Sequence, residues 1–74
     1  MSGRQIEHLV RMANQIALNT GAQVDAELSV RRTGEHIRKF WTPAMRDQLV
    51  DYWRQGGDGL EPVVISVLEF LAEK

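Results

Sequence analysis

The sequence predicts an all-α fold, a small bundle of three to four short helices that forms a single domain over residues 1–74. Three observations support this prediction. Apolar residues recur at helical spacing along most of the chain, prolines and glycines separate these stretches, and the one segment that would suit a strand has no second strand to pair with. A domain of this length buries only about 60% of the surface that its unfolded chain exposes. A partner or self-association would therefore add to a thin core.

The composition is that of a folded, soluble domain, with 43% hydrophobic and 26% charged residues. The net charge of −1 does not by itself indicate a nucleic-acid-binding protein. Cysteine is absent, which excludes disulfides and thiolate metal sites and fits a cytoplasmic location. No apolar run approaches the roughly 18 residues that a membrane span needs, and the first residues are not followed by the apolar region of a secretory signal.

The first helix is predicted from Gln5 to Leu18, with Ser2 as its cap. One apolar stripe with spacings of three and four residues supports it. The stripe consists of Ile6, Leu9, Val10, Ala13, Ile16 and Ala17. The helix should end at residues 19–21, because Gly21 can adopt the left-handed backbone conformation that terminates helices.

The second helix is predicted from Ala26 to about Phe40, with Asp25 as its cap. Gly34 in its interior costs about 1 kcal/mol relative to alanine. This glycine either lets another helix approach closely or marks a break, with residues 28–33 irregular or extended. The helical period of the apolar residues favours a continuous helix.

The third helix should begin at Pro43, with Thr42 as its cap, because a proline at the first helical position loses no hydrogen bond. The residue before a proline avoids the helical conformation, so the second helix should end near Trp41. The third helix extends to about Gln55, and its inner face consists of Ala44 or Met45, Leu49, Val50 and Trp53.

Three glycines within residues 56–59 stop the third helix. A phosphate-binding loop would need a preceding strand and a following Lys-Ser/Thr, which this segment lacks, so a flexible turn is predicted. The fourth helix should run from Pro62 to the end of the chain. Its β-branched residues Val63–Ile65 would also suit a strand. The predicted core consists of Leu9, Ala13, Ile16, Ile37, Leu49, Val50, Val64 and Leu68, with Phe40 or Trp41 between the helices.

The sequence shows no pattern that predicts a catalytic, cofactor-binding or metal-binding site. Two Glu-His pairs, at residues 7–8 and 35–36, are adjacent on helices and therefore point in different directions. The zinc-protease spacing of two histidines is absent. None of the serines lies in a recognisable nucleophile motif.

Positive charge gathers between Arg31 and Arg46, where five basic residues accompany a single acid, Glu35. Such a segment forms a nucleic-acid face, a docking face for an acidic protein surface, or simply a solvated helix face. The acidic balance of the whole chain favours the docking face over a nucleic-acid face.

The centre of this segment predicts a partner-binding site. Phe40 and Trp41 are about 100° apart on a helix, so both cannot easily face one thin core. One ring should fill the domain with Ile37, and the other should lie at the surface beside the basic pair, as in an interface hot spot. The predicted partner-binding residues are His36, Arg38, Lys39, Phe40, Trp41 and Arg46.

Three blocks of sequence resemble one known family. They are residues 9–16 (LVRMANQI), residues 36–41 (HIRKFW) with Pro43, Met45 and Arg46, and residues 56–57 with Gly59, Leu60 and residues 62–64. With these blocks, the chain resembles the delta subunit of NAD-dependent, molybdenum-containing formate dehydrogenase, the FdsD family. It departs from the family pattern at Thr42, where an acid is usual, and at Ala44, where a base is usual. Residues 19–33 also match poorly.

The resemblance implies a non-catalytic accessory subunit of a cytoplasmic enzyme complex, which supports assembly, cofactor loading or stability of the alpha subunit. It also implies that the alpha subunit holds the bis-molybdopterin guanine dinucleotide and iron–sulfur clusters. The other subunits would hold FMN, NAD and further clusters, and this chain no cofactor. The alternative is a free-standing helical regulator that binds nucleic acid through Arg31, Arg32, Arg38 and Lys39.

Overall fold

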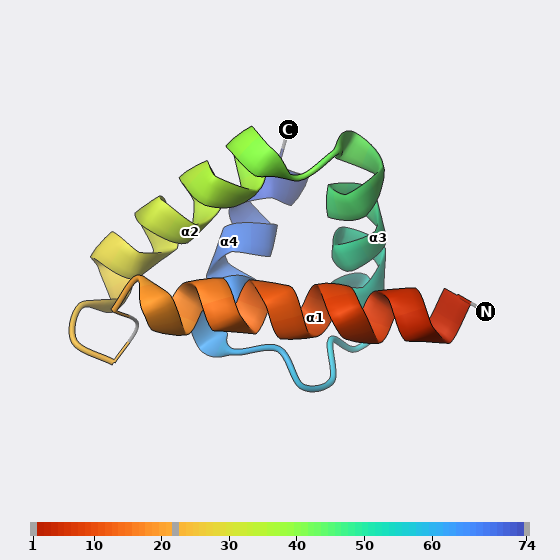
Figure 1. Cartoon of the computed structure of the whole chain (residues 1–74), viewed down its shortest axis with the longest axis horizontal. Coiled ribbons are helices and arrows are strands. Elements are labelled where there is room, and N and C mark those ends of the chain that lie inside the picture. Colours follow the sequence, from red (N-terminus) through yellow and green to blue (C-terminus); the bar gives the residue numbers. More distant parts are fainter. Residues whose placement is uncertain (1, 22, 74) are drawn as a thin grey trace.

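The computed structural model describes residues 2–21 and 23–73, and within these ranges the fold is all-α, as predicted. The described helices are α1 (Ser2–Asn19), α2 (Ala26–Phe40), α3 (Pro43–Arg54) and α4 (Pro62–Ala72). In Figure 1, α1 crosses the front of the molecule, α2 runs obliquely above it, and α3 and α4 stand behind it. α1 contacts each of the other helices, and α2 packs most extensively on α4.

The connection between α1 and α2 uses the two predicted signals. Gly21 has a φ of 89° in the turn that follows α1, and the Asp25 carboxylate accepts a hydrogen bond of 3.1 Å from the Leu28 amide. α2 then continues without a break through Gly34, so the alternative of an irregular segment at residues 28–33 is wrong. α1 begins at Ser2 rather than at Gln5, and Ser2 is therefore part of the helix instead of its cap.

The corner between α2 and α3 follows from the Thr-Pro pair. Trp41 and Thr42 both have extended backbones, with ψ angles of 142° and 158°. The hydroxyl of Thr42 accepts a hydrogen bond of 3.2 Å from the Met45 amide, and Pro43 is the first residue of α3. The predicted cap is confirmed, and the chain changes direction within two residues.

The connection between α3 and α4 is held by α1. The amide of Gly57 donates to the Tyr52 carbonyl at 3.0 Å, which closes the end of α3. The side chain of Asn14 donates to the Gly59 carbonyl at 2.9 Å and accepts from the Glu61 amide at 3.0 Å. Since Glu61 itself makes no side-chain cap for α4, Asn14 satisfies backbone groups at the entry to that helix.

The core lies between the four helices and contains most of the predicted residues. Leu9, Ala13, Ile37, Leu49, Val64 and Leu68 are buried, as expected, and Ala17, Trp41, Leu60, Val63 and Val67 join them. The prediction was wrong for Ile16 and Val50, which are only partly buried at the edge of the core. The residues Val63–Ile65 lie within α4, and the described part of the chain contains no strand.

A cluster of three hydroxyl groups joins the end of α1 to the start of α2. The hydroxyl of Thr20 lies 2.6 Å from that of Ser29 and 3.0 Å from that of Thr33. The hydroxyls of Thr20 and Ser29 also lie 3.0 and 3.1 Å from the Ala17 carbonyl. Because each hydroxyl carries a single hydrogen, the two cannot both donate to this carbonyl while they bond each other. Ser29 and Thr33 are fully buried, so these mutual bonds offset the cost of removing their hydroxyls from water.

Candidate partner-binding surface

Phe40 and Trp41, at the end of α2, lie in opposite environments. The ring of Trp41 is only 5% exposed and belongs to the core, whereas Phe40 is 70% exposed. α2 ends at Phe40, and Trp41 has an extended backbone instead of a helical one. The direction of the Trp41 ring is therefore not set by the helical period, and the ring packs inward. The expectation of one core ring and one surface ring is therefore met, with Trp41 as the core ring.

Phe40 forms an exposed aromatic pair with His36. Their ring centroids are 4.8 Å apart, and the ring planes are inclined by 46°. The two residues are four positions apart, which places them on the same side of α2. Lys39 is also exposed in the last turn of the helix. This end of α2 therefore presents aromatic surface beside a positive charge.

Arg38 and Arg46 come together elsewhere, at a hollow between α2, α3 and the end of α4. Asp47, Val50 and Leu71 complete its lining, and its volume is about 240 Å³. The Nε atom of Arg46 is buried and has no hydrogen-bond partner in the described part of the protein. A buried donor without an acceptor carries a free-energy cost, and because the protein itself covers this atom, a docked group would contact it only after a rearrangement.

The basic segment is therefore divided between two sides of α2. Residues two positions apart on a helix differ by about 200° in direction, so Arg38 and Phe40 point to nearly opposite sides. The structure brings His36 together with Phe40 and Arg38 together with Arg46, while Trp41 offers little surface. The step of about 100° between successive helical residues is enough to predict that Arg38 and Phe40 lie on opposite sides of α2. Their closeness in the sequence hides this separation.

A larger groove lies between α2 and α4 and shares Arg38 with the hollow. Its volume is about 510 Å³, and its apolar lining includes Val30, Val67 and the exposed ring of Phe70. Acidic and basic side chains of α2 alternate along its edge. The mixed charge at this edge is less suited to a nucleic-acid backbone than a uniformly basic face would be.

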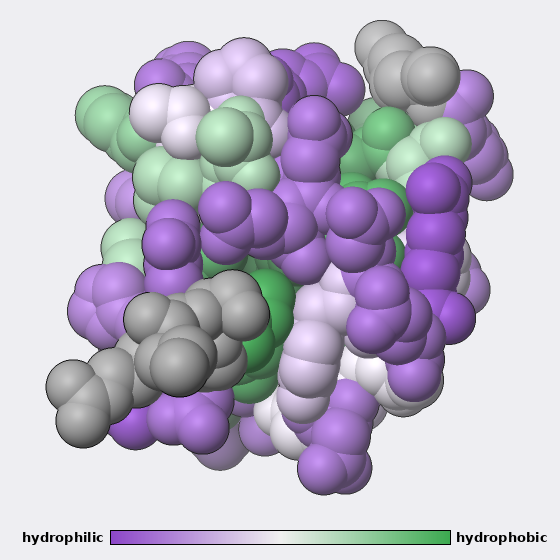
Figure 2. Space-filling view, turned by 90° about the vertical axis from the view of Figure 1, so that its right-hand side faces the viewer, coloured by the Kyte–Doolittle hydropathy of each residue, from purple (hydrophilic) through white to green (hydrophobic). Residues whose placement is uncertain are grey.

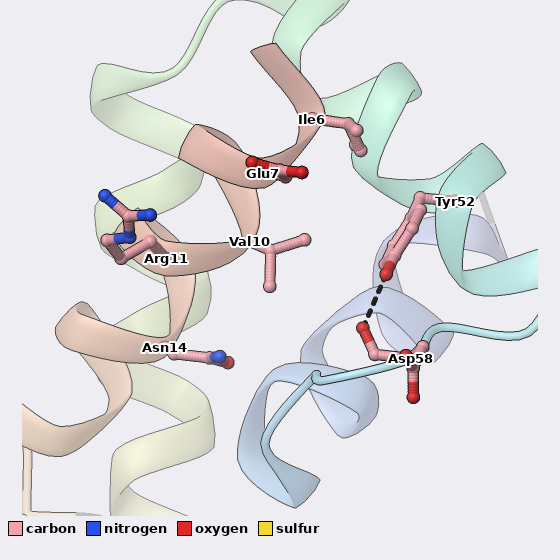
Figure 3. A pocket seen from close by; sticks show the side chains of 7 residues that line it. All are labelled: Ile6, Glu7, Val10, Arg11, Asn14, Tyr52 and Asp58. Carbon is pink, nitrogen blue, oxygen red and sulfur yellow. Dashed lines mark hydrogen bonds between the residues drawn. The ribbon is translucent and has the colours of Figure 1, made fainter. Parts of the chain in front are cut away.

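Another open hollow, of about 520 Å³, lies between α1, α3 and the loop that follows α3. Figure 3 shows Val10 and Asn14 of α1 facing Tyr52 and Asp58, while the side chain of Arg11 points away from them. The hydroxyl of Tyr52 donates to the Asp58 carbonyl, and Asn14 is bonded to the loop before α4. Asn14 and Tyr52 therefore hold the loop between α3 and α4 in place at this hollow.

Neither a metal site nor a membrane span is found in the part of the chain that the structure describes. No group of three His, Asp or Glu side chains that could hold a metal ion occurs among these residues. None of the helices in the described ranges is both long and apolar enough to span a membrane. The face on the α3 side of the molecule is mostly hydrophilic, with small areas of apolar surface, as Figure 2 shows.

Fold and surface together define a small all-α domain with open grooves and an exposed aromatic pair. Its sequence matches the family described as NADH-dependent formate dehydrogenase delta subunit, FdsD, over residues 8–68. Because this match covers most of the 74 residues, the chain belongs to that family. Comparisons with curated proteins and with solved structures found no match.

Proposed function

We propose that this chain is a non-catalytic accessory subunit of a cytoplasmic, NAD-dependent formate dehydrogenase. It supports assembly, cofactor loading or stability of the molybdenum-containing alpha subunit. Membership of the delta-subunit family carries the proposal, and the exposed pair of His36 and Phe40 supports it. An aromatic ring left 70% exposed in so small a domain is suited to burial against a partner.

The alpha subunit contacts the end of α2 from two sides. On one side, His36 and Phe40 bury their rings, and Lys39 adds a mobile positive charge. On the other side, the guanidinium groups of Arg38 and Arg46 receive a carboxylate or a backbone carbonyl at the hollow that both residues line. Trp41 fixes the corner from within the core, so that both sides keep their positions.

The chemistry of the complex belongs to its other subunits in this proposal. The alpha subunit holds bis-molybdopterin guanine dinucleotide and iron–sulfur clusters, and the remaining subunits hold FMN, NAD and further clusters. We expect the purified chain to carry no stoichiometric molybdenum, iron, flavin or pterin and to leave formate unoxidised, because the sequence lacks cysteine and any dinucleotide-binding fingerprint. Elemental analysis, absorption spectra and a formate oxidation assay check this. Bound molybdenum or iron in the isolated protein would contradict it.

The docking prediction is tested by Arg38→Ala/Lys39→Ala and, separately, by Phe40→Ala. All three side chains are exposed, so the variants should fold normally, as circular dichroism can verify. We expect each to copurify with the alpha subunit at least about tenfold less than the unaltered chain, because truncation of a central interface residue costs roughly 2 kcal/mol. Formate dehydrogenase activity of the complex should fall in parallel.

Two matched controls separate docking from a general loss of charge or apolar surface. Arg11→Ala/Arg54→Ala removes two exposed positive charges outside this end of α2, and Phe70→Ala removes another exposed ring. Both should copurify normally. Full association of Arg38→Ala/Lys39→Ala and Phe40→Ala at physiological salt would show that this surface is not the interface. Repeating the purification with and without molybdate distinguishes a permanent subunit from an assembly factor.

A further inference from the structure

The groove between α2 and α4 carries apolar surface that the chain does not cover. Phe70 is 59% exposed at one wall, and Val30 and Val67 line the interior. This groove differs from the surface formed by His36, Lys39 and Phe40, because it lies on the side of α2 that faces α4. Its occupant is therefore a separate question from what covers His36, Lys39 and Phe40, although Arg38 also lines the hollow proposed to receive the alpha subunit.

Four charged residues of α2 line the groove in alternating order. They are Glu27, Arg31, Glu35 and Arg38. Their spacings of four, four and three residues keep them along one side of the helix. From Glu27 to Arg38 the charges run negative, positive, negative, positive. In the opposite direction they run positive, negative, positive, negative, so each charge of the first order stands opposite a charge of the other sign. A second α2 helix that lies antiparallel to the first would therefore meet an opposite charge at every one of these positions.

The positions of these charges also agree with a two-fold axis. In an antiparallel pair, Glu27 faces Arg38 of the second copy, and Arg31 faces Glu35 of the second copy. The midpoints of these two pairings along α2 differ by about half a residue, or about 0.75 Å of helix length. One axis near residue 33 therefore serves both pairings, as the interface of a symmetric dimer requires.

Gly34 lies beside this axis, and the packing within one chain does not require it. Among the residues that the structure describes, a Cβ atom added at Gly34 would meet only Val67 Cγ1, at the ordinary contact distance of 3.8 Å. Alanine would fit there and would favour the helix more than glycine does. The absence of a side chain at this position is explained if the backbone of a second helix approaches closely.

We infer that the α2–α4 groove is the interface between two copies of this chain, with antiparallel α2 helices crossing near Gly34. Each copy buries the exposed ring of Phe70 against the other, and the four alternating charges fix the register. His36, Lys39 and Phe40 remain outside the interface. Arg38 is the residue that both surfaces share.

The dimer is tested by charge reversal in the full chain. The unaltered protein should shift from monomer to dimer between micromolar and submillimolar concentrations, as measured by sedimentation equilibrium. Arg31→Glu places two acids opposite each other, and Glu35→Arg places two bases opposite each other. Each variant alone should dimerise about 100-fold more weakly, because like charges face each other twice in the symmetric interface.

An equimolar mixture of the Arg31→Glu and Glu35→Arg variants distinguishes contact between copies from charge pairing along a single helix. In the mixed dimer with antiparallel helices, the acid introduced at position 31 of one copy faces the base introduced at position 35 of the other. We therefore expect the mixture to recover dimerisation that neither variant shows alone. Neither variant regains a charge pair within its own helix, so recovery comes only from contact between copies. A mixture that stays monomeric overturns the proposal.

Substitutions at Gly34 and Phe70 give a second measurement. Gly34→Ala should raise the melting temperature of the monomer and yet weaken dimerisation about tenfold, a combination that a merely structural glycine would not produce. Phe70→Ala should weaken the dimer, whereas Phe40→Ala, which removes the exposed ring outside the interface, should not. An unaltered chain that stays monomeric at every concentration, or a dimer insensitive to Gly34→Ala and to both charge reversals, overturns the inference.

Discussion

Trp41→Ala should leave a large fraction of the protein unfolded at physiological temperature. Trp41 is 5% exposed and packs in the core at the corner between α2 and α3. Removal of a buried tryptophan side chain costs about 3–5 kcal/mol. A domain of this length has a total stability of about 4–11 kcal/mol, and its thin core places it toward the lower end. Urea unfolding followed by far-UV circular dichroism measures the loss.

Phe40→Ala is the matched control, because it removes the neighbouring aromatic ring from an exposed position. With Phe40 70% exposed, the free energy of unfolding should change by less than about 0.5 kcal/mol. Trp41→Phe keeps part of the buried ring and should fall between the two. If Trp41→Ala and Phe40→Ala were equally stable, the division of this aromatic pair into a core residue and a surface residue would be wrong.

The ends of most helices could be predicted because single residues determine them. Pro43 and Pro62 begin α3 and α4 at the expected positions, and Asp25 and Thr42 act as the expected caps. These signals are local: a proline restricts its own backbone, and a cap bonds an amide three residues away. At the start of α1 the local signal was wrong: Ser2 was the expected cap of a helix from Gln5, but the helix already begins at Ser2.

Contacts between distant segments could not be predicted from local patterns. Ser29 and Thr33 are polar, yet they are fully buried because Thr20 and the Ala17 carbonyl satisfy their hydroxyls across the α1–α2 junction. Leu60 lies in a loop, outside any helical period, and is nevertheless buried. Such residues become part of the core through their tertiary partners, which the periodicity of one helix does not reveal.

The candidate site could likewise be predicted only in part from local sequence patterns. The sequence indicates that one of two adjacent rings is exposed, but the choice depends on where α2 ends. Because the helix stops at Phe40, the extended backbone of the next residue places Trp41 in the core. The groove between α2 and α4 depends on the packing of two helices far apart in sequence, and no motif within residues 26–40 indicates Phe70 as its wall.

Gly57→Ala should be the most disruptive of the single-methyl additions in the loop between α3 and α4. Gly57 has a φ of 65°, a conformation that costs an alanine about 1–2 kcal/mol. The added Cβ would also lie 3.2 Å from Leu60 Cδ1 and 3.3 Å from the Trp53 Cα atom. Since the Trp53 contact is with helical backbone, it cannot be relieved by a side-chain rotation. We expect a total loss of about 3 kcal/mol in the free energy of unfolding.

Gly59→Ala separates the two causes of this loss. Gly59 has a φ of 85°, but no atom of the described residues lies within 4 Å of an added Cβ, so only the backbone cost of about 1–2 kcal/mol applies. Asparagine tolerates this conformation better than alanine does, so Gly59→Asn should recover most of that cost, whereas Gly57→Asn should not, because its Cβ still meets Leu60 and Trp53. Equal losses for Gly57→Ala and Gly59→Ala in urea unfolding would mean that the loop moves freely away from α3. The bond between the Asn14 side chain and the Gly59 carbonyl ties this loop to α1 and opposes such a movement. The contacts at Gly57 should therefore persist, and the two losses should differ.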